Sequence, residues 1–263
     1  DPHGPRTDRR PPGVNRFAVR RAIPTVVAMC CRYALRRRDL ARAVETLRAR
    51  LAREADDHFN LPPGREIPVV RTTARGADRE VAWLHWGLVP SWAKTRADFG
   101  TRLANARAES LAAKPSFRDA LRQRRCVIPA SGFYEWASRE ASHQPWYFSA
   151  PEGAPLCFAG LWASWAEPGG PVLETCTLIT TAPNDLMRPI HDRMPALLAP
   201  EDCAVWLAAG PLKPEVVAAL LRPANVSSLC AHRVSPRVNT LAHDDAACLI
   251  ETAPPAEQLG LGL

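Results

Sequence analysis

The clearest chemistry in the sequence is at Cys30, which directly follows Met29. A methionine before a small residue is typical of a translation start, because that methionine is then readily removed. Removal would leave Cys30 with a free α-amine and a thiol two carbons apart. These groups titrate at about 7.7–8.0 and 8.5, so both are nucleophilic near neutral pH. Such a 1,2-aminothiol condenses with aldehydes to a thiazolidine ring; the alternative is a buried thiol at the start of a strand.

Two further polar residues stand in apolar surroundings. Glu135 lies between aromatic residues, where loss of hydration would raise the pKa of the carboxylate and suit it to proton transfer. The alternative is a salt bridge with an arginine. His191 is followed by Asp192, a possible orienting group, and by Arg193, a possible anion ligand. A hydrogen-bonded structural histidine is the alternative for His191.

Two more segments mix polar with apolar residues. Asn105 begins the first, which also carries Arg107 and Glu109. Residues 232–239 form the second segment. Charged side chains on a solvated edge strand would explain its polar residues equally well. Together with Cys30, Glu135 and His191, these two segments supply a nucleophile, a carboxylate, a histidine, an amide and arginines. That set is expected of a catalytic site acting on a phosphate-bearing substrate.

Charge and composition narrow the classes of protein. The net charge is +7, and residues 1–28 contribute +4 of it through six arginines against two aspartates, which leaves +3 for the remaining chain. Nucleic-acid binding would therefore depend on local clusters of arginine rather than on bulk charge. No run approaches the roughly 18 apolar residues of a membrane span, and the signal-like segment 22–31 is short and interrupted by Pro24. We expect a cytoplasmic protein with no membrane contact.

The eight cysteines do not indicate a disulfide framework in a chain of 263 residues, and no CxxC pair supports a structural zinc site. We expect no metal and no cofactor. Four cysteines lie in apolar runs and are expected in the core: Cys126, Cys157, Cys176 and Cys203.

The hydrophobic pattern predicts many short strands and few helices. Strands are expected at residues 30–35, 67–71, 81–89, 126–136 (broken by Pro129 and Gly132), 146–149, 156–165 and 176–181. Helices are expected at residues 39–55 (capped by Asp39), 116–125 (capped by Ser116), 184–188, 200–209 and 214–221, with loops at 59–64 and 90–104. This order predicts an α+β fold: a single domain with a curved, barrel-like, mostly antiparallel β core and peripheral helices.

The ends of the chain differ from its middle in composition. Residues 1–28 are rich in proline and arginine and lack hydrophobic periodicity, so we expect a disordered or artefactual extension there. The folded domain is expected at residues 29–252, followed by a flexible tail at 253–263.

Seven motifs follow one another along the chain: Met29-Cys30-x-Arg32-Tyr33, Asn60-x-x-Pro63-Gly64, Trp86-Gly87-Leu88-x-Pro90-x-Trp92, Asn105-Ala106-Arg107-x-Glu109, Gly132-Phe133-Tyr134-Glu135-Trp136, His191-Asp192-Arg193-Met194-Pro195 and Val234-Ser235-x-x-Val238-Asn239. This series resembles the SRAP family, the SOS-response-associated peptidases known for covalent capture of abasic sites in single-stranded DNA. The resemblance runs from Met29 to about Glu251, so the domain at 29–252 is interpreted as an SRAP domain.

The resemblance implies a chemistry for the N-terminal cysteine. The α-amine of Cys30 would form a Schiff base with the ring-opened aldehyde of an abasic deoxyribose, and the thiol would then close a thiazolidine. By the same resemblance, Asn105 would position Cys30, while Glu135 and His191 would move protons during ring opening, imine formation and reversal.

The resemblance also implies a single α+β domain with a basic channel that binds single-stranded DNA at abasic sites. We expect the protein to be a monomer. Arg32 and Arg107 would hold phosphates beside the lesion, with Arg193 a weaker candidate. Trp92 and Pro63 would line the DNA path, where an aromatic ring can stack on a base.

Two other functions remain open at the level of sequence. A thiol peptidase would use Cys30 as nucleophile, His191 as base and Glu135 or Asp192 as orienting group, and would need no free α-amine. A non-catalytic single-stranded DNA-binding protein would bind without forming an adduct.

Two features depart from the family pattern. Cys31 stands where the family usually has glycine, so a Cβ could crowd the sugar and a second thiol could compete for the aldehyde. Residues 1–28 would convert the amine of Cys30 into an amide while they are attached. We therefore expect that Met29 is the true start or that the Met29–Cys30 bond is cleaved.

Overall fold

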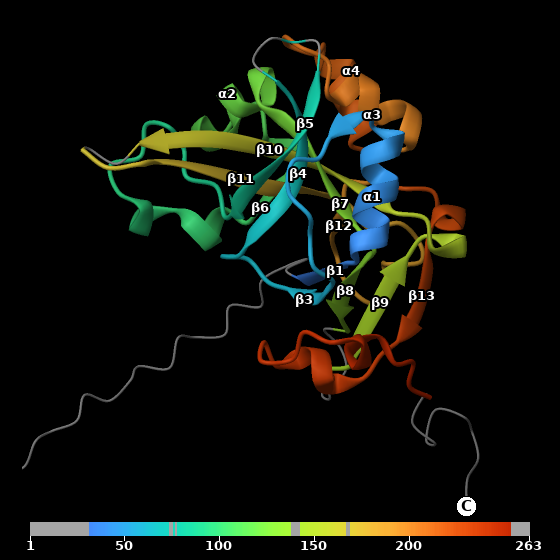
Figure 1. Ribbon diagram of the computed structural model, residues 1–263. Helices are drawn as coiled ribbons and strands as arrows, with labels where there is room; N and C mark the ends of the chain where they lie inside the picture. Colours follow the sequence, from blue (N-terminus) through green and yellow to red (C-terminus); the bar gives the residue numbers. More distant parts are fainter. Residues whose placement is uncertain (1–31, 74–75, 77, 138–142, 167–168, 254–263) are drawn as a thin grey trace, which may run out of the picture.

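Five strands close into a barrel in the computed structural model, which describes residues 32–73, 76, 78–137, 143–166 and 169–253 (Figure 1). The strands are, in spatial order, β5 (Arg79–Trp86), β4 (Glu66–Thr72), β7 (Arg125–Ala130), β10 (Leu156–Ala166) and β11 (Val172–Thr181). Neighbouring strands in this order pair antiparallel. A parallel pairing of β11 with β5, which joins Thr175 to His85 and Cys176 to Trp86, closes the barrel.

Three short strands extend the barrel. β6 (Asn105–Arg107) and β12 (Met194–Pro195) both pair with β11, and β2 (Ala49–Arg50) pairs with β5. A second sheet is antiparallel throughout, in the order β13 (Cys230–Arg233), β9 (Pro145–Ser149), β8 (Gly132–Trp136), β1 (Arg32–Leu35) and β3 (His58–Leu61). The predicted α+β domain with a barrel-like, mostly antiparallel core is confirmed. Of the segment 232–239, only His232 and Arg233 lie in the edge strand β13 and Arg233 is buried, while Pro236–Asn239 form a 3₁₀ helix, so a solvated edge strand does not describe this segment.

Ser131 is the point where the chain passes from the barrel strand β7 to β8 of the second sheet. Its amide donates to Ala34 O (2.7 Å), and its hydroxyl donates to the buried Asp39 carboxylate (2.6 Å). The Arg36 amide in turn donates to the Ser131 hydroxyl (2.8 Å). Asp39 therefore ties the first helix to this crossing.

In the described part of the chain, four α-helices lie outside the barrel: α1 (Arg37–Thr46), α2 (Pro115–Gln123), α3 (Pro200–Trp206) and α4 (Pro214–Leu220) (Figure 1). The prediction of a helix over 39–55 was wrong at both ends. Arg48 adopts φ 51° and turns the chain into β2, while the helix begins after Arg36, so Asp39 lies in its first turn and does not cap it.

Three other local predictions were wrong. Lys114 is the residue before α2 and Pro115 opens it, so Ser116 is not a cap. Residues 184–188 form a turn, in which Asn184 Oδ1 accepts from the Met187 amide (3.0 Å). Residues 59–61 of the loop expected at 59–64 belong to β3, because this segment pairs with β1.

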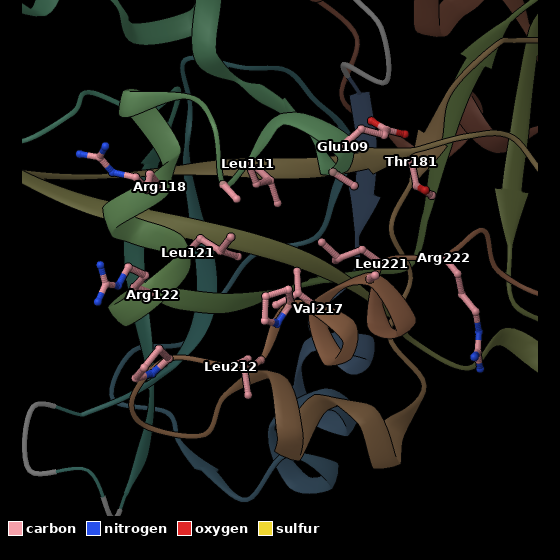
Figure 2. A pocket seen from close by; sticks show the side chains of 15 residues that line it. Glu109, Leu111, Arg118, Leu121, Arg122, Thr181, Leu212, Val217, Leu221 and Arg222 are labelled. Carbon is pink, nitrogen blue, oxygen red and sulfur yellow. The ribbon is translucent and has the colours of Figure 1, made fainter.

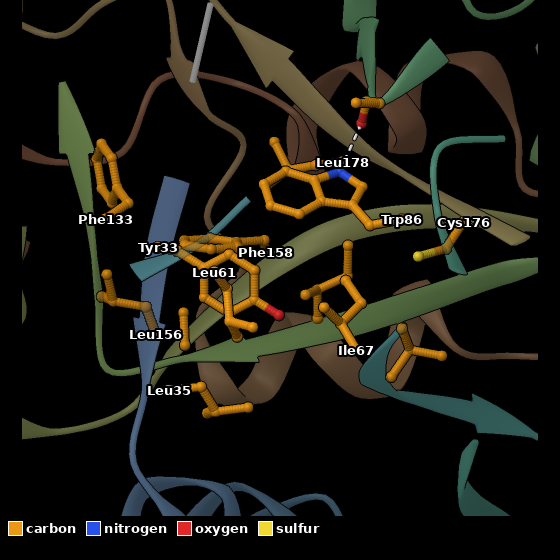
Figure 3. Close-up of a cluster of buried hydrophobic side chains, with 14 of the residues drawn as sticks. Tyr33, Leu35, Leu61, Ile67, Trp86, Phe133, Leu156, Phe158, Cys176 and Leu178 are labelled. Atoms are coloured by element: carbon orange, nitrogen blue, oxygen red, sulfur yellow. Dashed lines mark hydrogen bonds between the residues drawn. The ribbon is translucent and has the colours of Figure 1, made fainter. Parts of the chain in front are cut away.

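The two sheets share one apolar cluster, here called the first apolar cluster, which contains Tyr33, Trp86, Phe133 and Phe158 among its buried members (Figure 3). Tyr33 of β1 packs edge-on against Trp86 and Phe158 of the barrel, with ring centroids 5.4 and 6.0 Å away. The indole of Trp86 donates to Ala104 O (2.9 Å), which fixes the residue before β6. The expected burial of Cys126, Cys157, Cys176 and Cys203 is confirmed.

Gly132 is required at the start of β8 because a Cβ there would overlap Phe148 O and the Tyr147 ring. We expect Gly132→Ala to lower the free energy of unfolding by about 3 kcal/mol, since a strand backbone must move to admit the methyl group. Gly210→Ala is the matched control, because a Cβ there meets open space and strains only a φ of 80°. Equal losses in denaturant unfolding of the two variants would contradict this account of β8.

Candidate active site

Arg32 opens β1 and is the first described residue after the predicted nucleophile, since Cys30 and Cys31 lie outside the described residues. The Arg32 guanidinium donates to Val238 O and to Asn239 O (3.3 Å) and lies 5.0 Å from the centre of the Trp136 ring. The Trp136 indole donates to Asn239 Oδ1 (2.6 Å). The motif at 234–239 thus packs directly on β1 and β8 and anchors Arg32.

Asn60 fastens the same C-terminal segment from β3. Its side chain is buried, and Nδ2 lies within hydrogen-bond distance of Val238 O (3.1 Å), Thr240 O (3.2 Å) and His243 O (2.8 Å). An amide can satisfy several carbonyls of one turn in this way. Asn60 therefore has a structural role in its motif.

Asp244 also holds the C-terminal segment against β3, although no sequence pattern had indicated this residue. Its carboxylate accepts from the amides of Phe59 (2.6 Å) and Asn60 (2.8 Å) and from His58 Nδ1 (2.6 Å). Burial alone would raise the pKa of Asp244, but these hydrogen bonds outweigh burial and leave the pKa lowered. The ionised carboxylate thus stabilises the folded state.

We expect Asp244→Ala to lower the free energy of unfolding by roughly 1–3 kcal/mol near pH 6, because two backbone amides lose their acceptor. The pKa of Asp244 is lower in the folded state than in the unfolded state. Its contribution to stability is therefore fully present at pH values above the unfolded-state pKa, and it is lost as the pH falls through the folded-state pKa. The difference between wild type and variant should therefore shrink below about pH 4. Denaturant unfolding at pH 6 and pH 3 measures it, with the exposed Asp185→Ala as control. A difference that grows in acid would refute this role for Asp244.

A second group of motif residues gathers at the C-terminal end of β11. β6 pairs Asn105 with Leu178 and Arg107 with Thr180, and β12 pairs Met194 with Thr181. The motifs at 105–109 and 191–195, which are far apart in sequence, therefore flank one strand.

Arg193 and Glu109 join these two motifs. The Arg193 guanidinium makes a two-pronged ion pair with the Glu109 carboxylate, with both N–O distances 2.9 Å, and it also donates to Thr180 O (2.7 Å). Hydrogen bonding to Arg193 holds the pKa of Glu109 below its ordinary value. The guanidinium of Arg193, which is 12% exposed, is thus engaged within the protein as well as being a predicted phosphate ligand.

His191 is buried beside this ion pair. Its Nδ1 accepts from the Arg193 amide (3.0 Å) and lies 3.2 Å from the exposed Asp192 carboxylate. With Nδ1 accepting, a neutral His191 carries its proton on Nε2; a protonated ring can instead donate from Nδ1 to Asp192. The neutral ring can therefore donate a proton from Nε2 while its Nδ1 holds the Arg193 amide.

Glu135 is 2% exposed and lies on the same side of β8 as Phe133. Phe133 belongs to the first apolar cluster, as do Ala104, Ile190 and Met194. Ala104 precedes Asn105, while Ile190 and Met194 bracket His191. The same packed core therefore supports the segments that carry all three predicted polar residues.

The other three predicted DNA-binding residues lie at least partly at the surface. Arg107 is exposed at the end of β6, and Pro63 is half-buried in the turn after β3. Trp92 is 52% exposed and packs edge-on against Phe99, with ring centroids 5.3 Å apart. An indole with half of its surface uncovered can stack on a base.

Sequence reasoning missed the pairing of Glu109 with Arg193 and the role of Asp244. Glu109 was visible within its motif, but its partner Arg193 lies 84 positions away, so no local pattern indicated the pair. Asp244 carried no signal because its partners belong to β3. Among the described residues, no group of three or more His, Cys, Asp or Glu side chains could hold a metal ion. The described part of the chain also contains no helix long and apolar enough to cross a membrane.

The closed barrel and the ordered motifs define an SRAP protein. The family model described as SOS response associated peptidase (SRAP) matches residues 29–241, and the chain belongs to this family.

Several relatives carry a common name. The Abasic site processing protein YoqW of Bacillus subtilis is 39% identical over 183 residues, which cover 69% of this chain and 80% of that protein. The Abasic site processing protein HMCES of Gallus gallus is 32% identical over 232 residues, which cover 76% of this chain and 68% of that protein.

Solved structures share the fold. A crystal structure of a protein from Bacteroides thetaiotaomicron matches with a TM-score of 0.76 at 24% identity, covering 85% of this chain and 100% of its own. One from Bordetella bronchiseptica matches with a TM-score of 0.68 at 26% identity, covering 78% and 100%.

Proposed function

We propose that the protein captures abasic sites in single-stranded DNA by forming a thiazolidine with Cys30, exposed as the N-terminal residue of a domain at 29–252. One observation carries the proposal: the chain is an SRAP protein whose motif cysteine comes two residues before Arg32 in the sequence, and Arg32 opens β1, the strand paired with β8. Arg32, two residues after Cys30 in the sequence, pairs with Tyr134 of β8, the residue before Glu135. The names of the relatives support the choice of lesion.

The proposed reaction begins with opening of the abasic sugar. The C1′–O4′ bond breaks, O4′ gains a proton, and the C1′ hydroxyl loses one to become the aldehyde. The α-amine of Cys30 adds to this aldehyde, and loss of one water gives the imine. The thiolate then adds to the imine carbon while the nitrogen gains a proton, which closes the ring with a net loss of one water.

The buried polar residues supply the proton transfers in this proposal. Glu135, shielded from solvent, and His191, whose Nε2 is free to donate when Nδ1 accepts from Arg193, move protons to and from O4′ and the carbinolamine hydroxyl. Asn105 orients the α-amine through its amide. Their support on one apolar cluster favours a preorganised arrangement.

DNA affinity comes from phosphates in this proposal, because an abasic site offers no base to read. Arg32 and Arg107 contact the phosphates beside the lesion, and Trp92 and Pro63 line the path of the strand. Arg193, whose guanidinium pairs with Glu109, is a weaker candidate for a phosphate contact. The proposal requires one copy of the chain and no metal or cofactor.

A gel assay tests the proposal. The chain expressed from Met29 is mixed with a single-stranded oligonucleotide carrying one abasic site, or with the tetrahydrofuran analogue, which has no hemiacetal and cannot open to an aldehyde. We expect an adduct stable in denaturing gels with the first oligonucleotide alone. Salt-sensitive binding of both oligonucleotides without any adduct would favour a purely binding protein.

A further inference from the structure

A groove runs between α2 and α4 on the outside of the barrel, and it is here called the α2–α4 groove (Figure 2). Its volume is about 580 Å³. Its floor is apolar and includes Leu111, Leu121, Val217 and Leu221. Figure 2 shows these side chains pointing into the space between the two helices.

The floor of the groove is preorganised by the hydrophobic core beneath it. Leu111 and Leu221 are buried members of the hydrophobic core that also contains Phe117 and Trp206, and Leu121 and Val217 are half-buried against it. Side chains fixed in this way lose little conformational freedom when another apolar surface covers them. A groove of this size falls within the range of sites that hold ligands or anchoring side chains.

The rim of the groove is cationic at both ends. Arg118 and Arg122 project from α2, and Arg222 follows α4 at the opposite end (Figure 2). Arg118 pairs with Asp119 (3.2 Å), but no carboxylate of the described residues lies within ion-pair distance of Arg122 or Arg222. In the described part of the chain, the groove therefore offers one arginine without an ion-pair partner on each side of an apolar floor: Arg122 on α2 and Arg222 after α4.

Glu109 is the one acidic residue that lines the groove, and its charge is already compensated. Its two carboxylate oxygens accept from Arg193, which lowers its pKa. The occupant should thus carry acidic groups toward Arg122 and Arg222 and apolar groups toward the floor.

We propose that the α2–α4 groove binds an acidic amphipathic helix of a partner protein. Such a helix presents apolar side chains at i, i+3, i+4 and i+7 to a groove between helices, with carboxylates along its edges. Single-stranded DNA fits the groove less well, because none of its lining residues is aromatic and Leu and Val offer no stacking surface for bases. A second copy of the chain, with a net charge of +7, also fits less well than an acidic partner.

The groove lies next to the candidate active site without being part of it. Glu109 and Thr181 line one end of the groove, and Thr181 pairs with Met194 in β12, three residues after His191. A partner bound here would therefore lie beside the candidate active site. It would leave Arg32 and Arg107 uncovered, since neither lines the groove.

Fluorescence polarisation with a defined peptide tests this proposal without DNA. The probe is a labelled peptide of about 14 residues, roughly four helical turns, with leucines at i, i+3, i+4 and i+7 and glutamates elsewhere. We expect saturable binding that weakens with salt. The double variant Arg122→Glu with Arg222→Glu should weaken it by about tenfold or more, because two attractions become repulsions. Arg42→Glu on α1, outside the groove, should change it by less than about twofold.

Three outcomes would overturn the proposal. Equal binding of a peptide with lysines in place of glutamates would remove the charge argument, and equal binding with serines in place of leucines would remove the apolar one. If the double arginine variant lost crosslinking of abasic DNA yet bound the peptide normally, the groove would belong to the DNA path. Because the peptide assay contains no DNA, its result is independent of whether Cys30 forms a thiazolidine.

Discussion

Cys30→Ala should lower the yield of gel-stable adduct with abasic single-stranded DNA by more than about 100-fold, because alanine keeps the α-amine but lacks the thiol that closes the ring. The variant can still form an imine, which hydrolyses readily. Reduction with borohydride should therefore trap a secondary amine between the variant and the DNA. This pair of results would separate the role of the amine from that of the thiol.

Cys31→Ala is the matched control, because it removes the neighbouring thiol and leaves Cys30 in place. We expect its adduct yield to stay within about threefold of wild type, since the α-amine and thiol of one residue form the five-membered ring. If Cys31→Ala lost the adduct while Cys30→Ala retained it, the nucleophile would be misassigned.

Glu135→Gln should slow adduct formation by about 100-fold or more, because an amide of the same shape cannot take up or release the proton that general acid–base catalysis requires. The carboxylate is 2% exposed, so water cannot readily replace it. Single-turnover rates of adduct formation measured across pH provide the readout. The part of the pH dependence that the Glu135 carboxylate causes in the wild type should be absent in the variant.

Glu152→Gln is the control for this substitution, since Glu152 is an exposed residue after β9. Both variants should unfold at temperatures close to wild type. A Glu135→Gln protein with wild-type rates at every pH would show that the carboxylate does not move protons in this reaction.

The architecture could be predicted from the sequence in part, and the limits have physical causes. Short alternating strands indicated a barrel-like sheet because strand patterns are local. Closure of the barrel by the parallel pairing of Thr175 with His85 was not predictable, since it joins residues that are distant in sequence. The end of α1 was also missed, because the leucine periodicity continues to Leu51 although Arg48 turns the chain into β2.

The candidate site was predictable where its motifs are contiguous. Glu135 and His191 were selected because a polar group in an apolar segment is unusual. The motif around Asn60 was recognised, but its role in holding residues 238–243 was not, because Asn60 acts on distant backbone carbonyls. Asp244 left no trace in the sequence for the same reason.

The central claim is tested most directly by mass spectrometry of the adduct formed by a chain that begins at Cys30. We predict that the intact mass equals protein plus oligonucleotide minus one water, and that peptide mapping places the modification on Cys30. A chain that retains residues 1–28 should give no adduct, because its Cys30 nitrogen is an amide. An equal yield from that longer chain with its Met29–Cys30 bond intact, or a modification on another residue, would contradict the thiazolidine mechanism.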